Sequence, residues 1–168
     1  MLPILPPALF LQSPAHTPVI PSTVKARPGV FIVQGAPDEA TFAALKAAGI
    51  TRVFNLRTDA EGDFRFEEAG AKAAGAGYTR CPVDHTLSDA ALDAFRAQLR
   101  ALPPKSRILV HCATGNRAAA ALLTAWVLDQ GLPVKDAIAL ARRSGLTKPG
   151  LEAKALAYIR ERRTASGG

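Results

Sequence analysis

The stretch from Arg107 to Gln130 constrains the fold more than any other part of the chain. An apolar run that reads as a strand, from Arg107 to Val110, leads into a short loop that contains glycine. An Ala/Leu-rich run from Ala118 to Gln130 then predicts a helix. In such an arrangement the N–H groups of the loop point inward and the helix dipole adds positive potential, which makes an anion site. The loop holds a cysteine, Cys112, and the same field favours its thiolate, so we expect a nucleophile near neutral pH.

Arg117 closes this loop with a planar guanidinium that can hold two oxygens of a phosphate or a similar oxyanion. We therefore expect Cys112 and Arg117 to be catalytic, with the substrate oxygens held by the residues around them. The predicted binding residues are His111, Ala113, Thr114, Gly115, Asn116 and Arg117.

The motif His111-Cys112-x-x-Gly115-x-Arg117 resembles the active-site loop of cysteine-dependent protein tyrosine and dual-specificity phosphatases. Four residues separate Cys112 from Arg117, one fewer than these phosphatases generally have. The shorter spacing resembles a nonclassical bacterial group of phosphatase-like proteins, also found fused to β-lactamase-type hydrolases. The rhodanese sulfurtransferases share the same spacing, so the loop alone leaves both families open.

Segments outside the loop favour the phosphatase relative. The stretch from Gly49 to Arg57 resembles a strand of the nonclassical family that ends in asparagine, leucine and arginine. The stretch from Tyr78 to Asp84 resembles the segment that carries the phosphatase general acid, whereas two segments usual in rhodaneses do not occur. This resemblance covers about residues 29–163. It implies an α/β, cysteine-phosphatase-like fold with a central, mostly parallel sheet of four to five strands flanked by helices.

Apolar and amphipathic runs alternate from Gly29 onward, which by itself predicts a layered α/β domain. Residues 1–28 predict a Pro-rich extended arm, and residues 29–168 a single catalytic domain. Strands are expected at 30–33, 51–56, 78–83 and 107–110, and helices at about 37–48, 64–74, 89–102, 118–130, 134–144 and 150–163.

The charge balance favours an anionic partner, since the formal net charge is +7. The phosphatase resemblance implies a phosphorylated protein or a small phosphomonoester as the partner, and no motif indicates a specific nucleic-acid site. The apolar start of the chain is too short and too broken by proline to predict a membrane span, and a cytoplasmic protein is expected. The two cysteines imply no disulfide framework, and Cys81 is expected to be a small buried residue. The histidines and cysteines lack the spacing of metal ligands, so neither a metal nor another cofactor is expected; the oligomeric state stays open.

The resemblance implies two-step phosphoryl transfer through a phosphocysteine on Cys112, with a general acid that protonates the leaving oxygen. Asp84 is the predicted acid and Asp89 the alternative, although the position of Asp89 after Ser88 favours the start of a helix over a catalytic role. Ala118 stands where active phosphatases commonly have a hydroxyl that assists hydrolysis of the phosphocysteine, so a slow second step is expected. A sulfurtransferase, or a weakly active module that binds phosphate, remains the alternative.

Overall fold

The computed structural model of the chain describes residues 19–166, so most of the predicted N-terminal arm lies outside the described residues. Within them, a single sheet is flanked by helices, and one short 3-10 turn, η1 (Asp59–Glu61), lies after the third strand. The strands are β1 (Thr23–Arg27), β2 (Val30–Val33), β3 (Arg52–Asn55), β4 (Gly77–Arg80) and β5 (Ile108–His111). The helices are α1 (Glu39–Ala44), α2 (Arg65–Ala73), α3 (Asp89–Arg100), α4 (Asn116–Leu128), α5 (Val134–Arg143) and α6 (Pro149–Ser166).

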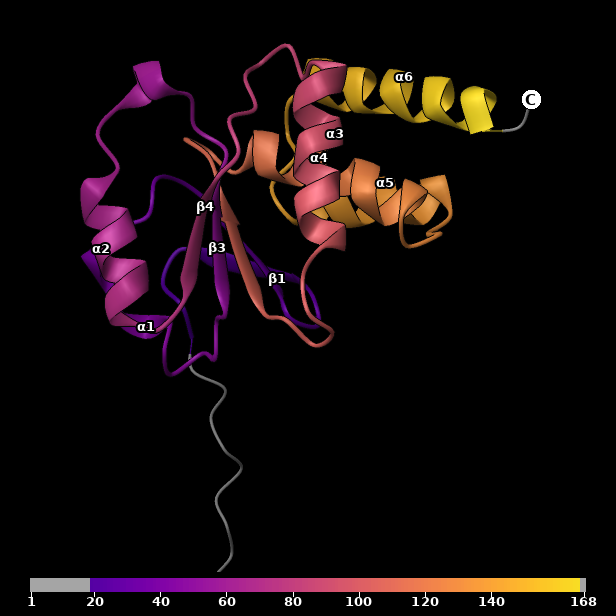
Figure 1. The fold of residues 1–168 in the computed structure, drawn as a ribbon. Coiled ribbons are helices and arrows are strands. Elements are labelled where there is room, and N and C mark those ends of the chain that lie inside the picture. The colour runs from indigo at the N-terminus through magenta and orange to yellow at the C-terminus, as the bar shows by residue number, and fades with distance from the viewer. Residues whose placement is uncertain (1–18, 167–168) are drawn as a thin grey trace, which may run out of the picture.

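The sheet confirms the predicted fold class. Its strand order is β1-β2-β5-β3-β4, and every neighbouring pair is parallel except β1 with β2. Figure 1 shows α1 and α2 over one face of the sheet and α3 to α6 over the other. Helices on both faces are what a parallel sheet requires, because its strands are buried on both sides.

The strand β1 was not expected, because residues 23–27 were placed in the Pro-rich arm. It pairs with β2 across the turn Pro28-Gly29, in which Gly29 has a φ of +77°. A proline followed by a glycine with positive φ is a favourable tight turn. Pro21 and Pro28 flank this segment, which is why its sequence resembles a loop. Prolines are tolerated next to β1 because it is an edge strand, which pairs with a neighbour on one side only.

Two apolar layers hold the sheet between the helices. Alternate strand residues face opposite sides, so Phe54 and Val110 pack toward α4 while Val53 and Leu109 pack toward α1 and α2. The helix α4 is buried along almost its whole length, since Ala and Leu occur on every side of it. Trp126 on this helix is fully buried, as expected of a core residue. The nucleophile loop is therefore fixed between a central strand and a central helix.

Candidate active site

The candidate site lies at the carboxyl ends of the parallel strands, where open α/β sheets place their ligands. The loops after β3, β4 and β5 meet there, and the last of them carries Cys112. These loops supply, in order, Glu61, Asp84 and the segment 112–117.

Cys112 lies at the base of a tight loop between β5 and α4, and its side chain is fully buried. The backbone N–H of Gly115 donates to the Cys112 sulfur at 3.2 Å. Gly115 has a φ of +84°, and a Cβ atom there would lie 2.9 Å from the carbonyl oxygen of Val33. Only glycine fits this position, both by backbone conformation and by space. Ala113 and Thr114 are exposed, so they form the solvent side of the loop.

Arg117 is buried beside the sulfur, and its guanidinium is held from two sides. Its Nη1 donates to the carbonyl oxygen of Val83 and to Glu61 Oε2, both at 2.9 Å. Its Nη2 donates to Glu61 Oε1 at 2.5 Å, which makes a bidentate ion pair. Burial alone would lower the pKa of Arg117, but the Glu61 carboxylate and the Cys112 sulfur together raise it. The arginine is thus a fixed cation next to the predicted nucleophile.

Glu61 is a site residue that the sequence interpretation missed. It ends η1 and accepts a hydrogen bond from the backbone N–H of Thr58 at 2.7 Å, and one from the hydroxyl of the same residue. The hydrogen bond from Arg117 is the main cause that lowers the pKa of Glu61 from 4.5 to about 2. The spacing Thr58-x-x-Glu61 is that of a capping box, in which the acid side chain accepts from the backbone N–H of the first residue. This spacing was the sequence signal that Glu61 is hydrogen-bonded within the protein.

Asn116 supports the loop through its side chain. Its Oδ1 accepts from the backbone N–H groups of Thr147 and Lys148 at 2.8 and 3.0 Å, and its Nδ2 donates to Thr114 Oγ1 at 3.4 Å. The segment that precedes α6 is therefore tied to the first residue of α4. Asn116 was one of the predicted binding residues, and its side-chain oxygen accepts hydrogen bonds from the protein backbone.

His111 is fully buried and lies in the register that pairs β5 with β3, opposite Asn55. Its Nε2 is 3.1 Å from Glu67 Oε2 on α2, although the two atoms are not aligned as a hydrogen bond. The imidazole consequently does not line the exposed side of the loop. It lies behind Cys112, on the face of the sheet that α2 covers.

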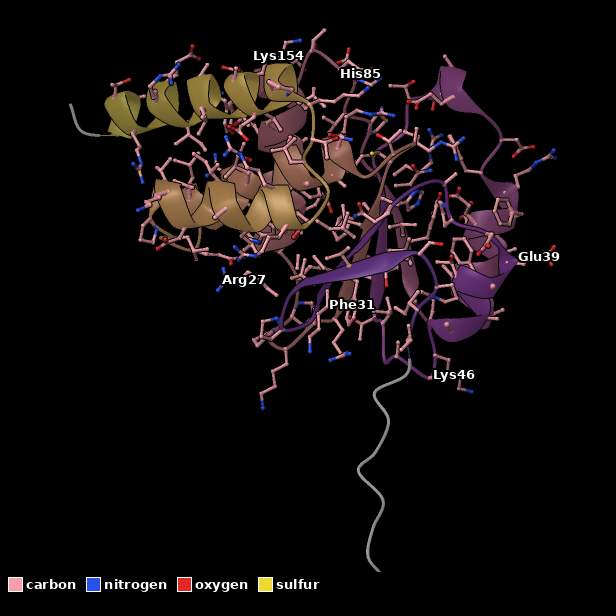
Figure 2. The ribbon with its side chains drawn as sticks, turned by 180° about the vertical axis from the view of Figure 1, so that it is seen from behind. Arg27, Phe31, Glu39, Lys46, His85 and Lys154 are labelled. Atoms are coloured by element: carbon pink, nitrogen blue, oxygen red, sulfur yellow. The ribbon has the colours of Figure 1, made fainter. Side chains whose placement is uncertain are left out.

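Asp84, the predicted general acid, is exposed in the loop after β4. Its Oδ1 accepts from the hydroxyl of Thr86 at 2.5 Å and from the backbone N–H of Thr86 at 2.8 Å, and these two bonds lower the pKa of Asp84. Lys154 of α6 donates to the carbonyl oxygen of His85 at 2.7 Å, and Figure 2 shows the two residues side by side above the sheet. The loop that carries Asp84 is therefore attached to α6.

Asp89, the alternative acid, begins α3 directly after the N-cap residue Ser88. Its Oδ2 lies 3.2 Å from Arg162 Nη2 on α6. This placement agrees with a residue that starts a helix and pairs with a neighbouring helix.

Cys81 is buried at the end of β4, as expected, and burial raises the pKa of its thiol. Because β3 lies between β4 and β5, the two cysteines are separated by two strand spacings, about 10 Å. A disulfide needs Cα atoms within about 7 Å, so Cys81 and Cys112 do not pair in this arrangement.

Within residues 19–166, no helix combines the length and apolar character needed to cross a membrane. The same residues contain no group of three or more His, Cys, Asp or Glu side chains placed to hold a metal ion.

Several solved structures with the same fold are phosphatase-like proteins. A DUF442 protein assigned as a phosphatase, from Shewanella putrefaciens, is 24% identical with a TM-score of 0.68, and the match covers 84% of this chain and 93% of that one. Tk-PTP is 15% identical with a TM-score of 0.71, over 87% of this chain and 99% of that one. TpbA from P. aeruginosa, solved as a cysteine-to-serine variant in complex with phosphotyrosine, is 19% identical with a TM-score of 0.66. That match covers 88% of this chain and 91% of TpbA.

No protein-family model matches the chain, and no curated protein matches it by sequence. At these identities the structural likeness shows the fold, which is that of the tyrosine-phosphatase-like proteins.

Proposed function

We propose that this protein is a cysteine-dependent phosphatase that hydrolyses phosphomonoesters through a phosphocysteine intermediate. One observation carries the proposal. The buried Cys112 sulfur lies in a tight loop in which the backbone N–H of Gly115 donates to it, and the guanidinium of Arg117 is held beside it. Such a loop stabilises both a thiolate and the equatorial oxygens of a phosphoryl group.

In the first step the Cys112 thiolate attacks phosphorus in line, and the alcohol or phenol oxygen leaves. The backbone N–H groups of the loop and Arg117 hold the three equatorial oxygens while charge spreads over them. Because both Glu61 oxygens accept hydrogen bonds from the guanidinium, Arg117 is already oriented before the substrate binds. Water then hydrolyses the phosphocysteine and releases inorganic phosphate.

Asp84 is the general acid in this proposal, because it follows β4 at the same end of the sheet as Cys112. An acid must be protonated to donate, and the bonds from Thr86 lower the pKa of Asp84. The carboxyl therefore has to leave Thr86 before it can protonate a leaving group. This requirement confines fast turnover to acidic pH.

The second step is slow in this proposal, because Ala118 offers no hydroxyl to the departing thiolate. The Ala118 side chain is fully buried at the start of α4, so no solvent molecule replaces that hydroxyl without displacing its neighbours. We expect the phosphoenzyme to accumulate and to appear as a burst of the first product.

The proposed substrate is a phosphotyrosyl or other phosphoprotein. The exposed loop residues Ala113 and Thr114 have small side chains that leave room for a large leaving group. The complex of TpbA with phosphotyrosine shows that this fold can hold such a group in that protein. The net charge of +7 favours an anionic partner.

The test is hydrolysis of para-nitrophenyl phosphate across about pH 5 to 8. Turnover that disappears in Cys112→Ser but persists in Cys81→Ser supports the proposal. Binding of vanadate without turnover would instead indicate a phosphate-binding module. A persulfide on Cys112, detected by mass spectrometry of the isolated protein, would indicate a sulfurtransferase.

A further inference from the structure

The segment that joins α5 to α6 lies against the nucleophile loop and is held there by two side chains. Asn116, the first residue of α4, accepts hydrogen bonds at its Oδ1 from the backbone N–H groups of Thr147 and Lys148, at 2.8 and 3.0 Å. From the end of β2, Gln34 Nε2 donates to the carbonyl oxygen of Ser144 at 2.9 Å. The segment is therefore fixed relative to the loop that is proposed to hold the phosphoryl group.

Gln34 also packs between two glycines, one in each of the parts that it joins. A Cβ atom at Gly145, where φ is +109°, would overlap the Gln34 side chain. A Cβ atom at Gly115 in the nucleophile loop would lie 3.3 Å from Gln34 Nε2. Ser144 and Leu146, on either side of Gly145, are buried. Close packing and hydrogen bonds thus hold the segment, so its exposed residues stay at the edge of the site.

Lys148 is the charged residue of this segment, which spans residues 144–148. Its backbone N–H donates to Asn116, and its carbonyl oxygen accepts from the N–H groups of Leu151 and Glu152 in the first turn of α6. Its side chain is exposed, and the ion pairs found among residues 19–166 do not include it. The backbone fixes where the side chain begins, and the flexible four-carbon stem lets the ammonium reach a bound ligand.

The acids near the start of α6 do not neutralise Lys148. Glu152 pairs with Arg142 at 2.7 Å. Asp84, the exposed acid of the site, has a different cation nearby, since Lys154 donates to the carbonyl oxygen of the next residue at 2.7 Å. The N-terminus of α6, the positive end of its dipole, lies directly after Lys148. This edge of the site is therefore positive.

We propose that Lys148 determines substrate specificity by binding an acidic residue next to the phosphorylated residue of a phosphoprotein. The inference rests on the proposed function, because it names the phosphoproteins that the site takes. Adjacent Cα atoms are about 3.8 Å apart, so a chain whose phosphoryl group lies in the nucleophile loop places its neighbouring residues over the rim of that loop. On the side of Asn116 this rim is the segment 144–148, and its charge complements a carboxylate.

Binding of phosphotyrosyl peptides to the Cys112→Ser protein tests this role, because that variant keeps the loop and lacks the nucleophile. Peptides of equal length carry Glu, Ala or Lys on both sides of the phosphotyrosine, and isothermal titration calorimetry measures each Kd. We expect the Glu peptide to bind about fivefold more tightly than the Ala peptide, the effect of one exposed ion pair. When Lys148→Gln is added, this preference should fall below about twofold. When Lys148→Glu is added instead, the Lys peptide should bind most tightly.

Lys72→Glu is the matched control, because it makes the same change in net charge at an exposed residue in the last turn of α2. This helix runs from the end of β3 to the start of β4, so its last turn lies at the end of the sheet away from the nucleophile loop. The control should keep the preference for the Glu peptide. An equal loss in Lys72→Glu would mean that net charge alone sets the preference, and it would overturn the inference.

An unchanged preference in Lys148→Glu would also overturn the inference. So would the absence of any peptide binding, even if the native protein hydrolyses para-nitrophenyl phosphate. Conversely, a preference that depends on Lys148 in a protein without turnover would leave the inference standing and refute only the proposed catalysis. If Lys148→Glu does not fold, Lys148→Gln decides, because it removes the charge from an exposed side chain and introduces no acid.

Discussion

Replacing Glu61 by glutamine removes the negative charge that holds Arg117 while keeping the size and shape of the side chain. In the native protein both carboxylate oxygens accept from the guanidinium, and one also accepts from Thr58. The variant keeps one side-chain oxygen that can accept from the arginine, beside the carbonyl oxygens of Val83 and Leu56, but it supplies no counter-charge. A buried cation without its counter-ion is destabilising.

The magnitude follows from the pKa of Glu61, which falls from 4.5 to about 2 in the folded protein. At about 1.36 kcal/mol per pKa unit this corresponds to about 3 kcal/mol of stability at neutral pH. Because the side chain is 27% exposed and screened by solvent, we expect a measured loss of about 2 kcal/mol. A lowered folded-state pKa gives stability that is complete above pH 4.5 and is lost as the pH falls toward 2.

Urea unfolding of the native protein and Glu61→Gln at about pH 7 and about pH 3 measures this dependence. The difference in the free energy of unfolding should shrink to less than about half at the lower pH, because protonation removes the charge in the native protein. Glu68→Gln, which changes an exposed acid, is the control for the change in net charge. The same difference at both pH values would refute an ion pair as the source of the stability.

Three further changes test other parts of the site. Ala118→Ser should restore a hydroxyl near the sulfur and speed hydrolysis of the phosphoenzyme about tenfold, the effect of one hydrogen bond, which stopped-flow kinetics would show as a smaller burst. An unaltered burst would count against the explanation for slow turnover. Thr86→Ala should let the pKa of Asp84 rise toward its ordinary value, so the basic limb of kcat/KM should move to higher pH. A limb that stays in place would remove Asp84 as the general acid. Gly115→Ala should cost about 1–3 kcal/mol more than Gly131→Ala in thermal or urea unfolding. Both glycines have positive φ, but a Cβ would clash only at Gly115, so equal costs would contradict the close contact.

Local sequence signals were enough to predict the parallel strands and the nucleophile loop. The apolar run before Cys112 and the glycine three residues after it define the strand, the turn and the start of α4 without reference to the rest of the chain. The expected helices correspond to those in the structure, although α1 ends at Ala44, before the expected end at residue 48. These strands, turns and helices depend on residues close together in the sequence, so short-range patterns predict them.

The contacts of two acids, the partly exposed Glu61 and the buried Glu67, could not be predicted from such short-range patterns. Glu61 lies in a polar stretch that resembles a solvated turn, and only the crossover between β3 and β5 brings it to Arg117, 56 residues away. Glu67 lies among polar residues of α2, yet its spacing from Ala71 places both on the buried face of that helix. An acid on an apolar helical face was the signal, and its partners come from three different strands.

The separation of the two cysteines has a consequence for the chemistry of oxidation. A peroxide can convert the Cys112 thiolate to a sulfenic acid. This sulfenic acid has no second protein thiol within bonding distance, because β3 separates the strand before Cys112 from the strand before Cys81. The chain cannot trap that oxidised sulfur as an internal disulfide unless its sheet opens. Small thiols that enter past the exposed Ala113 and Thr114 can then reduce the sulfur, whereas further oxidation gives the irreversible sulfinic acid.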